Sequence, residues 1–372
     1  MPLFPLLSHL TPAHPFHGYG WDQGFAESFA DCVEGDRSLT PARIVRVDRG
    51  RCDLVVPDGA GVRTVRADAA PVATGDPLAI MCTGDFAAVD LDQGCVRALL
   101  PRRTAFVRST SSKRSEGQIL AANVDQAVIA VSLAAELDLG RIERFLALAW
   151  ESGAQPLVVL TKADLVPDPH TLSHLVSDVE TVAPGVQVLP VSAATGDGVD
   201  VLAAQLVSGT SVLLGQSGAG KSTLANALLG EVVQDVQTTR DVDGKGRHTT
   251  TTRDLLPLPW GGVLIDTPGL RGVGLWDAEE GLSQVFSEVE ALAEDCRFHD
   301  CAHHGEPGCA VLAAVADGTL PERRLDSYRK LLRENQRLAA RTDARLRAEI
   351  RRDWKQKQAL GRHMLERKGR GR

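Results

Sequence analysis

Short apolar runs alternate with polar residues over the segment from residue 41 to residue 100. Five such runs, separated by turn residues, lie at 42–47, 51–56, 61–66, 78–81 and 86–90. Several short strands at this spacing are typical of a small antiparallel barrel. The pattern therefore predicts an OB-fold β-barrel, a type of barrel that often binds nucleic acid.

Beyond residue 124 the apolar runs become longer, and helical periodicity appears between them. Near-continuous apolar runs predict buried strands at 127–131, 156–160, 186–191, 211–214 and 262–265. Helical spacing predicts helices at 141–150, 199–206, 222–229, 278–294 and 321–364. Strands that alternate with helices predict a parallel sheet that is covered on both faces.

Two segments follow neither pattern. Residues 1–38 are rich in His, Pro and aromatic residues and have no steady period, so we expect an extension that packs on the body or stays mobile. Residues 102–114 are basic and rich in hydroxyl groups, which indicates a linker between the barrel and the sheet.

The net charge of -7 conceals an asymmetry along the 372 residues of the chain. Residues 321–372 hold 18 Lys/Arg and 7 Asp/Glu, a local charge of +11, so the rest of the chain carries -7 minus 11, or -18. A basic tail on an acidic body favours a polyanionic partner, although a solvated helix also explains such a tail.

The seven cysteines are odd in number and only the last three cluster, so we expect no disulfide framework. The first residues lack the basic stretch and the apolar core of a signal peptide, and no run approaches 18 apolar residues. These features predict a cytoplasmic monomer that makes no contact with a membrane.

A nucleotide-binding motif, Gly-Gln-Ser-Gly-Ala-Gly-Lys-Ser-Thr, occupies residues 215–223. It matches the Walker A pattern between a predicted strand and a predicted helix, where backbone N–H groups and a helix N-terminus surround phosphate. Lys221 is expected to reach the β- and γ-phosphates, and the Ser222 hydroxyl to ligate Mg²⁺. The predicted nucleotide contacts of this loop are Gly215, Gln216, Ser217, Gly218, Ala219, Gly220, Lys221, Ser222 and Thr223.

The segment after the strand at 156–160 indicates that the base is guanine. Thr161-Lys162-Ala163-Asp164 resembles the Asn-Lys-x-Asp element of GTPases, with Thr in place of Asn. The Asp164 carboxylate can only accept hydrogen bonds, so it pairs with the N1–H and N2–H₂ donors of guanine and mismatches adenine. Lys162 is expected to lie along the base and ribose. Because Thr161 lacks the carboxamide of Asn, we expect weaker anchoring of the base or of the loop.

A second base-reading segment follows the next strand. Ser192 and Ala193 resemble the Ser-Ala element whose backbone N–H contacts guanine O6. Neither base-reading segment is specific alone, but each gains from the other and from the Walker A loop.

Two predicted switch segments flank the last strand, at 262–265. Asp266-Thr267-Pro268-Gly269 matches Asp-x-x-Gly, in which Asp266 holds Mg²⁺ through water and the Gly269 N–H contacts the γ-phosphate. Before that strand, a threonine in the run 249–252 can ligate Mg²⁺ only while the γ-phosphate is present. We favour Thr250 for this role, with Thr251 as the alternative.

The position after Asp-x-x-Gly is Leu270, where conventional GTPases carry the Gln that orients the attacking water. An apolar side chain cannot position water, so intrinsic hydrolysis should be slow unless a partner, a cation or another residue completes the site. His248 in the first switch segment is a candidate for this catalytic role, and a structural histidine is the alternative reading.

The order of these segments is rotated. Conventional GTPases run from the Walker A loop through the switches to the base readers, whereas here the base readers come first. The sequence therefore predicts a circularly permuted GTPase domain in which the second switch leads directly into the C-terminal domain. We hypothesise that this short connection transmits the state of the nucleotide to that domain.

Three cysteines and three histidines lie within residues 296–309. The spacing Cys-x₄-Cys-x-His-x₅-Cys predicts a closed, structural Zn²⁺ site, with His299 and His304 as alternative nitrogen ligands. The predicted ligands are Cys296, Cys301, His303 and Cys309.

The permuted order, the segments 246–251 and 266–269, and the Cys₃His cluster together resemble the RsgA (YjeQ) family of bacterial small ribosomal subunit biogenesis GTPases. Pro101-Arg102-Arg103 and residues 121–125 resemble that family's barrel-to-GTPase junction. The resemblance spans roughly residues 40 to 340. It implies an OB-fold, a permuted GTPase domain and a zinc domain, together with a Cys₃His ligand set and GTP contacts at 161–164 and 215–223.

We therefore expect a multidomain chain with an N-terminal extension at 1–38 and an OB-fold barrel at 39–102. A circularly permuted α/β P-loop GTPase domain at 103–276 and a mostly α zinc-binding domain with a basic C-terminal helix at 277–372 follow. The resemblance implies GTP hydrolysis to GDP, stimulated by the small (30S) ribosomal subunit and its rRNA late in maturation. The alternatives are a zinc-containing RNA-binding module with a regulatory nucleotide site, and a GTPase that acts on another RNA.

Overall fold

The structure is a computed structural model that describes residues 15–33, 36, 38–109, 117–230, 253–265 and 278–342. Five strands close a barrel in the order β1-β2-β3-β5-β4, and β4 pairs back with β1. These strands are β1 (Leu39–Val47), β2 (Arg51–Asp58), β3 (Gly61–Asp68), β4 (Phe86–Asp90) and β5 (Cys95–Leu99). Their alternating apolar side chains fill the barrel, which agrees with the predicted OB-type architecture.

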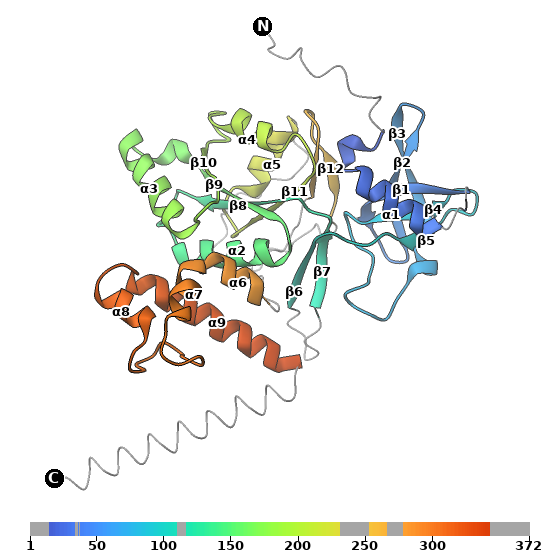
Figure 1. The fold of residues 1–372 in the computed structure, drawn as a ribbon. Coiled ribbons are helices and arrows are strands. Elements are labelled where there is room, and N and C mark those ends of the chain that lie inside the picture. The colour runs from blue at the N-terminus through green and yellow to red at the C-terminus, as the bar shows by residue number, and fades with distance from the viewer. Residues whose placement is uncertain are drawn as a thin grey trace, which may run out of the picture. The chain divides into compact units, whose positions relative to one another are not determined.

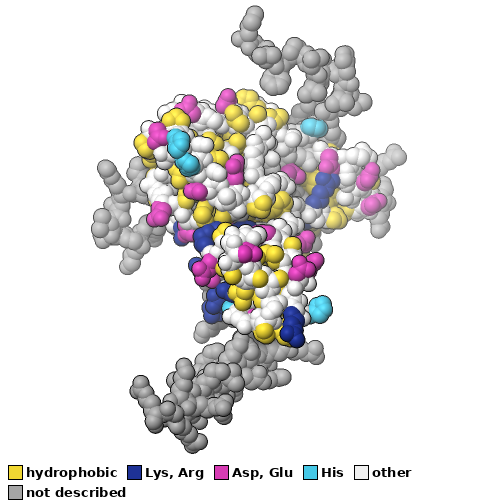
Figure 2. Space-filling view, turned by 60° about the vertical axis from the view of Figure 1, so that its left-hand side comes forward, with side chains coloured by type: hydrophobic (Ala, Val, Ile, Leu, Met, Phe, Trp, Pro, Cys, Tyr) yellow, Lys and Arg dark blue, Asp and Glu magenta, His cyan; other side chains and the backbone are white. Residues whose placement is uncertain are grey.

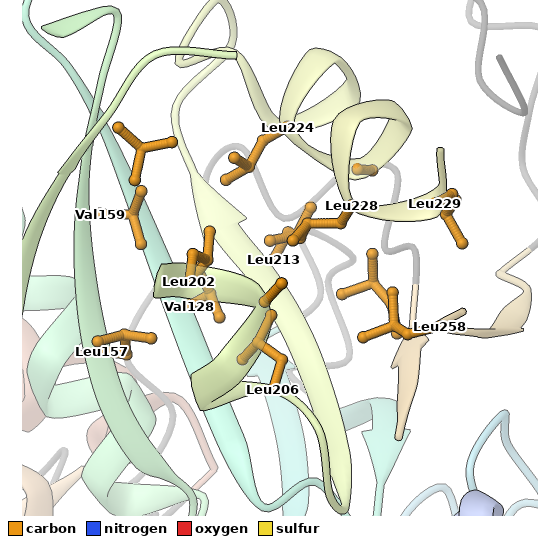
Figure 3. Packing of buried hydrophobic residues seen from close by; sticks show 14 residues of the cluster. Val128, Leu157, Val159, Leu202, Leu206, Leu213, Leu224, Leu228, Leu229 and Leu258 are labelled. Atoms are coloured by element: carbon orange, nitrogen blue, oxygen red, sulfur yellow. The ribbon is translucent and has the colours of Figure 1, made fainter. Parts of the chain in front are cut away.

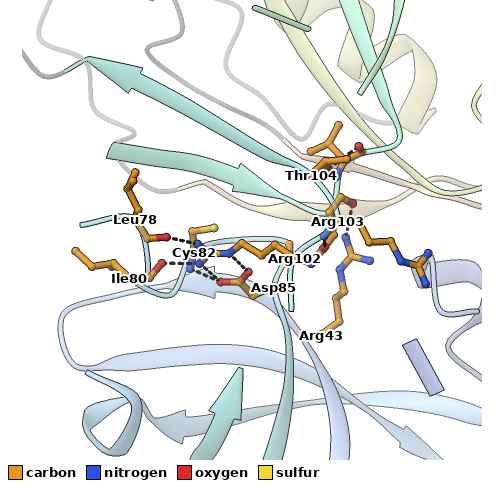
Figure 4. A network of polar contacts seen from close by, with 11 residues as sticks. Arg43, Leu78, Ile80, Cys82, Asp85, Arg102, Arg103 and Thr104 are labelled. Atoms are coloured by element: carbon orange, nitrogen blue, oxygen red, sulfur yellow. Dashed lines mark hydrogen bonds and ion pairs between the residues drawn. The ribbon is translucent and has the colours of Figure 1, made fainter. Parts of the chain in front are cut away.

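One predicted barrel strand is wrong. Residues 78–81 form no strand, and the fifth strand is instead β5, which the sequence reasoning missed. The carbonyl groups of Leu78 and Ile80 accept hydrogen bonds from the Arg102 guanidinium at 2.8 and 2.6 Å, so they are not available to a neighbouring strand (Figure 4). A short 3-10 helix, η2 (Ala70–Val72), precedes this loop.

A six-stranded sheet follows, in the order β10-β9-β8-β11-β13-β12, with every neighbouring pair parallel except β12 and β13. Its strands are β8 (Gln126–Ser132), β9 (Gln155–Thr161), β10 (Val188–Val191), β11 (Thr210–Gly215), β12 (Leu255–Pro257) and β13 (Val263–Ile265). The strand that leads into the Walker A loop, β11, lies inside the sheet although three parallel strands precede it in the chain. The predicted permuted order is therefore confirmed.

Helices cover both faces of this sheet (Figure 1). They are α2 (Leu139–Glu151), α3 (Pro169–Val182), α4 (Val199–Gln205) and α5 (Lys221–Leu229). Aliphatic side chains of α4, of the residue that follows it and of α5 pack over those of β8, β9 and β11 (Figure 3), namely Leu202, Leu206, Leu224 and Leu228 over Val128, Leu157, Val159 and Leu213. This dry layer fixes the position of the helix that begins at the Walker A lysine.

The predicted linker at 102–114 contains a strand. β6 (Ala105–Ser109) pairs with β7 (Gly117–Ala122) in a separate two-stranded sheet. The linker reading missed the strand because Arg and Ser at neighbouring positions mask its single large apolar side chain, Phe106, which is buried.

The described part of the N-terminal extension packs on the barrel. It contains a 3-10 helix, η1 (His17–Tyr19), and α1 (Gln23–Val33). The rings of Trp21 and Phe25 lie 5.2 and 4.2 Å from that of Phe86 on β4. Phe16 joins the same buried cluster, so aromatic packing orders a segment that lacks periodicity.

The chain forms two compact units, residues 1–107 with 119–273, and residues 108–118 with 274–372. The helices of the second unit are α6 (Glu279–Val285), α7 (Ser287–Glu294), α8 (Ala310–Ala316) and α9 (Glu322–Thr342). The predicted helix at 278–294 is thus two helices that meet at Phe286. Arg324 of α9 pairs with Glu288 of α7 at 2.5 Å and lies over the ring of Phe286, the residue between α6 and α7. These contacts join α9 to the junction of α6 and α7.

Acidic side chains are scattered among uncharged and hydrophobic ones on the face that Figure 2 shows. None of the helices in the described ranges combines the length and hydropathy that a membrane span requires.

Candidate functional site

The loop between β11 and α5 has the backbone of a phosphate-binding turn. Gly215, Gly218 and Gly220 adopt φ values of 138°, 79° and 81°, a region that other residues rarely enter. A Cβ atom on Gly215 would lie 2.4 Å from the Ala130 carbonyl oxygen on β8. All three positions therefore favour glycine for their conformation, and Gly215 also for space.

The Walker A lysine lies folded over this loop. Its Nζ donates to the Gly215 and Gln216 carbonyl oxygens, at 2.8 Å each. Ser222 and Thr223 follow it in the first turn of α5, where the helix dipole favours an anion. The arrangement places one cation and a helix N-terminus at the same end of β11.

The first base-reading segment is joined to this loop by hydrogen bonds. Thr161 ends β9, and its hydroxyl donates to the Ala219 carbonyl at 2.7 Å. Lys162 has a left-handed backbone (φ 60°), and its Nζ donates to the Gly218 carbonyl at 3.0 Å. The threonine hydroxyl thus makes a bond between the two segments by itself, and the expectation of weaker anchoring than with Asn stays a prediction.

The second base-reading segment holds the predicted guanine reader. The Ser192 hydroxyl, beyond the end of β10, donates to the Asp164 carboxylate at 2.6 Å. Ser192 is buried, and its backbone N–H is fixed by the Asp197 carbonyl at 2.9 Å. Ala163 and Asp164 lie in the short helix η3 (Ala163–Leu165). The carboxyl ends of β9, β10 and β11 thus meet, where ligands bind in open α/β sheets.

The structure adds one neighbour that the sequence analysis missed. Arg141, in the first turn of α2, donates to the Gln216 side chain and lies 3.3 Å from Asp138. A separation of 75 residues left no sequence signal for this contact.

Six residues that the sequence analysis considered for the switches lie outside the described residues. They are His248, Thr250, Thr251, Asp266, Gly269 and Leu270. The described residues that border these segments are Arg253, two residues before β12, and Ile265, which ends β13.

In the second unit, four of the predicted metal ligands converge. Ligand atoms of Cys296, Cys301, His303 and Cys309 all lie within 4.8 Å of one another. The sulfurs of Cys296 and Cys309 are 3.8 Å apart, and His303 Nδ1 lies 3.4 Å from the Cys309 sulfur. A tetrahedral zinc has bonds of about 2.3 Å to sulfur and about 2.0–2.1 Å to nitrogen. It therefore requires about 3.8 Å between two sulfur ligands and about 3.6 Å between a sulfur and a nitrogen ligand. The donor set and spacing therefore fit Zn²⁺.

Backbone contacts order the metal loop around His303. His303 has φ 56°, and the carboxylate of Glu306 accepts from the backbone N–H groups of Ala302, His304 and Gly305. Hydrogen bonds from backbone N–H groups, first its own and then those of these neighbours, lower the pKa of Glu306 to about 2. Arg329 of α9 donates to the His303 carbonyl. The alternatives His299 and His304 are not in the cluster.

Comparisons with known proteins agree with this geometry. The RsgA GTPase family model matches residues 99–276. The small ribosomal subunit biogenesis GTPase RsgA of Streptomyces avermitilis is 70% identical over 363 residues, which cover 97% of this chain and 96% of that protein.

Two solved structures share the fold. YjeQ from Thermotoga maritima has a TM-score of 0.58 at 25% identity, covering 80% of this chain and 98% of that one. YloQ, described as a circularly permuted GTPase, has a TM-score of 0.59 at 22% identity, and the match covers 81% of this chain and 96% of YloQ. With its rotated strand order, its Walker A loop and its close relatives, the chain belongs to the RsgA GTPase family.

Proposed function

We propose that this GTP hydrolase binds the small (30S) ribosomal subunit late in maturation and hydrolyses GTP to GDP and phosphate as an assembly checkpoint. The observation that carries the proposal is the joining of the base-reading segments to the Walker A loop. Thr161 bonds Ala219 of that loop, and Ser192 bonds Asp164, which supports a proposed guanine reader beside a proposed triphosphate site. The name of the Streptomyces avermitilis relative supports the choice of partner.

Residue roles follow from this arrangement. Asp164 accepts from the N1–H and N2–H₂ groups of guanine, and the Ser192 hydroxyl fixes its carboxylate. Lys221 leaves the Gly215 and Gln216 carbonyls for the β- and γ-phosphates, whose oxygens are stronger acceptors for an ammonium group. Residues 215–223 supply N–H donors, and Ala193 a backbone N–H for guanine O6.

The remaining catalytic roles rest on the sequence alone. Ser222, Thr250 and, through water, Asp266 would hold Mg²⁺, which would supply positive charge to neutralise the phosphates. Gly269 contacts the γ-phosphate, and His248 orients the attacking water in place of the Gln that Leu270 replaces. Because an apolar side chain leaves that water unheld, we propose that the subunit completes the site.

The zinc set has a structural role in this proposal. Four protein ligands fill the coordination shell, so the ion ties the loop at 296–309 to α8 and offers no open position for catalysis. Three thiols near one another require a reducing compartment, which supports a cytoplasmic location. We further propose that the chain acts as a monomer with domains at 39–102, 103–276 and 277–372.

The test is GTP turnover with and without purified small ribosomal subunits. We expect stimulation of more than about tenfold, because the partner supplies the missing water contact. Lys221→Ala should abolish hydrolysis while the far-ultraviolet circular dichroism spectrum stays unchanged. Stimulation by another RNA alone would favour a different RNA partner. Absence of turnover under every condition would favour an RNA-binding module with a regulatory nucleotide site.

A further inference from the structure

The barrel carries a tight turn at residues 82–85 whose conformation is held by buried charge. Asp85 is fully buried and accepts two hydrogen bonds from Arg102, at 2.6 and 2.7 Å (Figure 4). The same carboxylate accepts from the Cys82 backbone N–H at 2.8 Å. Because a bidentate pair of this kind is directional, the turn has one well-defined conformation.

This turn contacts the hairpin between the two predicted switches at both of its ends. The Thr83 hydroxyl donates to the Arg253 carbonyl at 2.9 Å. Gly84 packs against β7 and against the hairpin, since a Cβ atom there would lie 2.2 Å from the Ala122 carbonyl oxygen and 3.0 Å from Ile265 Cδ1. Arg253 follows directly on the run at 249–252, and Ile265 directly precedes Asp266. A second, more exposed contact is the 3.7 Å ion pair between Arg46 and Asp254.

The hairpin is also joined to the central sheet by strand pairing. Leu255 of β12 lies opposite Ile265 of β13, and β13 pairs with β11, the strand that leads into the Walker A loop. A displacement at either end of the hairpin is therefore opposed by the turn on one side and by the sheet on the other. Packed elements of this kind transmit small shifts because they resist continuous deformation.

The turn is in addition linked to a surface loop of the barrel. The Arg102 guanidinium that holds Asp85 also donates to the carbonyls of Leu78 and Ile80. The side chains of these two residues are 47% and 50% exposed. One arginine thus orders both an exposed apolar loop and the turn that lies against the switch hairpin.

We propose that the turn at 82–85 positions the hairpin between the switches, so that the barrel and the nucleotide site bias each other through Thr83 and Gly84. Thr83 acts in this way as a positioning residue for γ-phosphate recognition. The inference rests on the proposed GTP-dependent switch, and it adds a route through the barrel to the predicted route through the C-terminal domain.

Thr83→Val removes the hydroxyl and keeps the shape of the side chain. We expect affinity for a non-hydrolysable GTP analogue to fall about 3- to 10-fold, since the segment that contacts the γ-phosphate loses one anchoring hydrogen bond. Affinity for GDP should change less than about twofold, because GDP lacks the γ-phosphate. Fluorescence titrations with labelled nucleotides measure both constants.

Thr83→Ser retains the donor and should keep the wild-type ratio of the two affinities. Thr64→Val, on an exposed position of β3, controls for a general effect on the barrel. A wild-type ratio in Thr83→Val would overturn the proposal while leaving the GTPase function intact. Equal affinity of the wild-type protein for GTP and ATP analogues would instead defeat the proposed function, and this inference with it.

Amide hydrogen exchange of the wild-type protein provides a second measurement that needs no variant. We expect amides in residues 78–86 to exchange more slowly with the GTP analogue than with GDP. Identical exchange in the two states would also overturn the proposal.

Discussion

Two short hydroxyl side chains hold the proposed nucleotide pocket together. Thr161 bridges β9 to the Walker A loop at 2.7 Å, and Ser192 bridges the loop after β10 to Asp164 at 2.6 Å. Both side chains are nearly fully buried, so little side-chain freedom is left to lose when a ligand binds. The two base-reading segments are therefore fixed in this structure, as a preorganised site for a base would require.

Asp164→Asn should invert the choice of base. An amide can donate where the carboxylate only accepts, so the N2–H₂ group of guanine would face a donor. We expect GTP affinity to fall about 100-fold, in line with a loss of a few kcal/mol for a mismatched buried polar contact. Xanthosine triphosphate, which carries a carbonyl oxygen at that position, should bind better than GTP.

Competition titrations with the two nucleotides measure this preference. Asp178→Asn, an exposed carboxylate on α3, is the control and should leave both affinities unchanged. Unchanged GTP affinity in Asp164→Asn would remove Asp164 from the base pocket.

The segment between α7 and α8 is ordered by polar contacts more than by an apolar core. The Glu306 carboxylate accepts hydrogen bonds from three backbone N–H groups, and Arg329 donates to the His303 carbonyl. The Cys309 sulfur accepts from the Leu312 N–H at 3.4 Å as the N-cap of α8. Bound metal would add its coordination energy directly to the stability of such a segment. The loop therefore has the geometry of a structural zinc site with a supporting shell of hydrogen bonds.

Metal analysis of the purified protein should find about one zinc per chain, and Cys301→Ala should lose it. Removal of one thiolate leaves three ligands, which is too few for a closed tetrahedral shell. The same variant should lower the melting temperature, because coordination energy stabilises this loop. Cys32→Ala, on α1, should retain the metal. A wild-type protein without zinc, or a Cys301→Ala variant that keeps it, would contradict the ligand assignment.

The first compact unit is held together at one buried guanidinium. Arg43 donates to the Tyr19 carbonyl at 2.7 Å, to the Asn123 carbonyl at 3.2 Å and to the Thr210 hydroxyl at 2.8 Å. Burial lowers its pKa to about 10, so it stays charged at neutral pH. Arg43 on β1 of the barrel therefore connects the N-terminal extension to the start of β11. These bonds add to the aromatic packing that holds the extension on the barrel.

A second polar contact of the N-terminal extension, the ion pair between Arg103 and Asp22, is pH-sensitive. Arg103 donates two bonds to Asp22, at 2.5 and 2.6 Å, and this pairing lowers the pKa of Asp22 from its usual 3.8 to about 2. A depressed folded-state pKa gives stability that is present above about 3.8 and is lost as the pH falls towards 2. Since the pair is exposed, its contribution is below about 1 kcal/mol.

Asp22→Asn should therefore lower the melting temperature by about 1–3 °C between pH 5 and 7, and the difference from wild type should vanish near pH 2. Differential scanning fluorimetry across this range measures it. Asp31→Asn, on the same helix, should show no such pH-dependent difference. A constant difference at every pH would mean that Asp22 acts through its shape and not its charge.

Local spacing was enough to predict the Walker A loop, the base-reading segments and the metal ligands, because each of these motifs lies within one short segment. It was also enough for the rotated order of the GTPase domain, which the sheet topology confirms. The choice of His303 over His299 and His304 followed from spacing and agrees with the cluster.

Contacts between distant segments had no such signal. The fifth barrel strand, the strand at 105–109 and the packing of Trp21 on Phe86 depend on pairing and burial that only the assembled chain provides. Thr161 is an example, because its hydroxyl connects two segments only through the Ala219 carbonyl, which is 58 residues away in the sequence. Sequence alone determined which groups are the candidates for the chemistry, because those groups are defined by type and spacing. Tertiary structure decided how they are held, because a hydrogen bond or a packed turn needs two segments whose meeting is set by the whole fold.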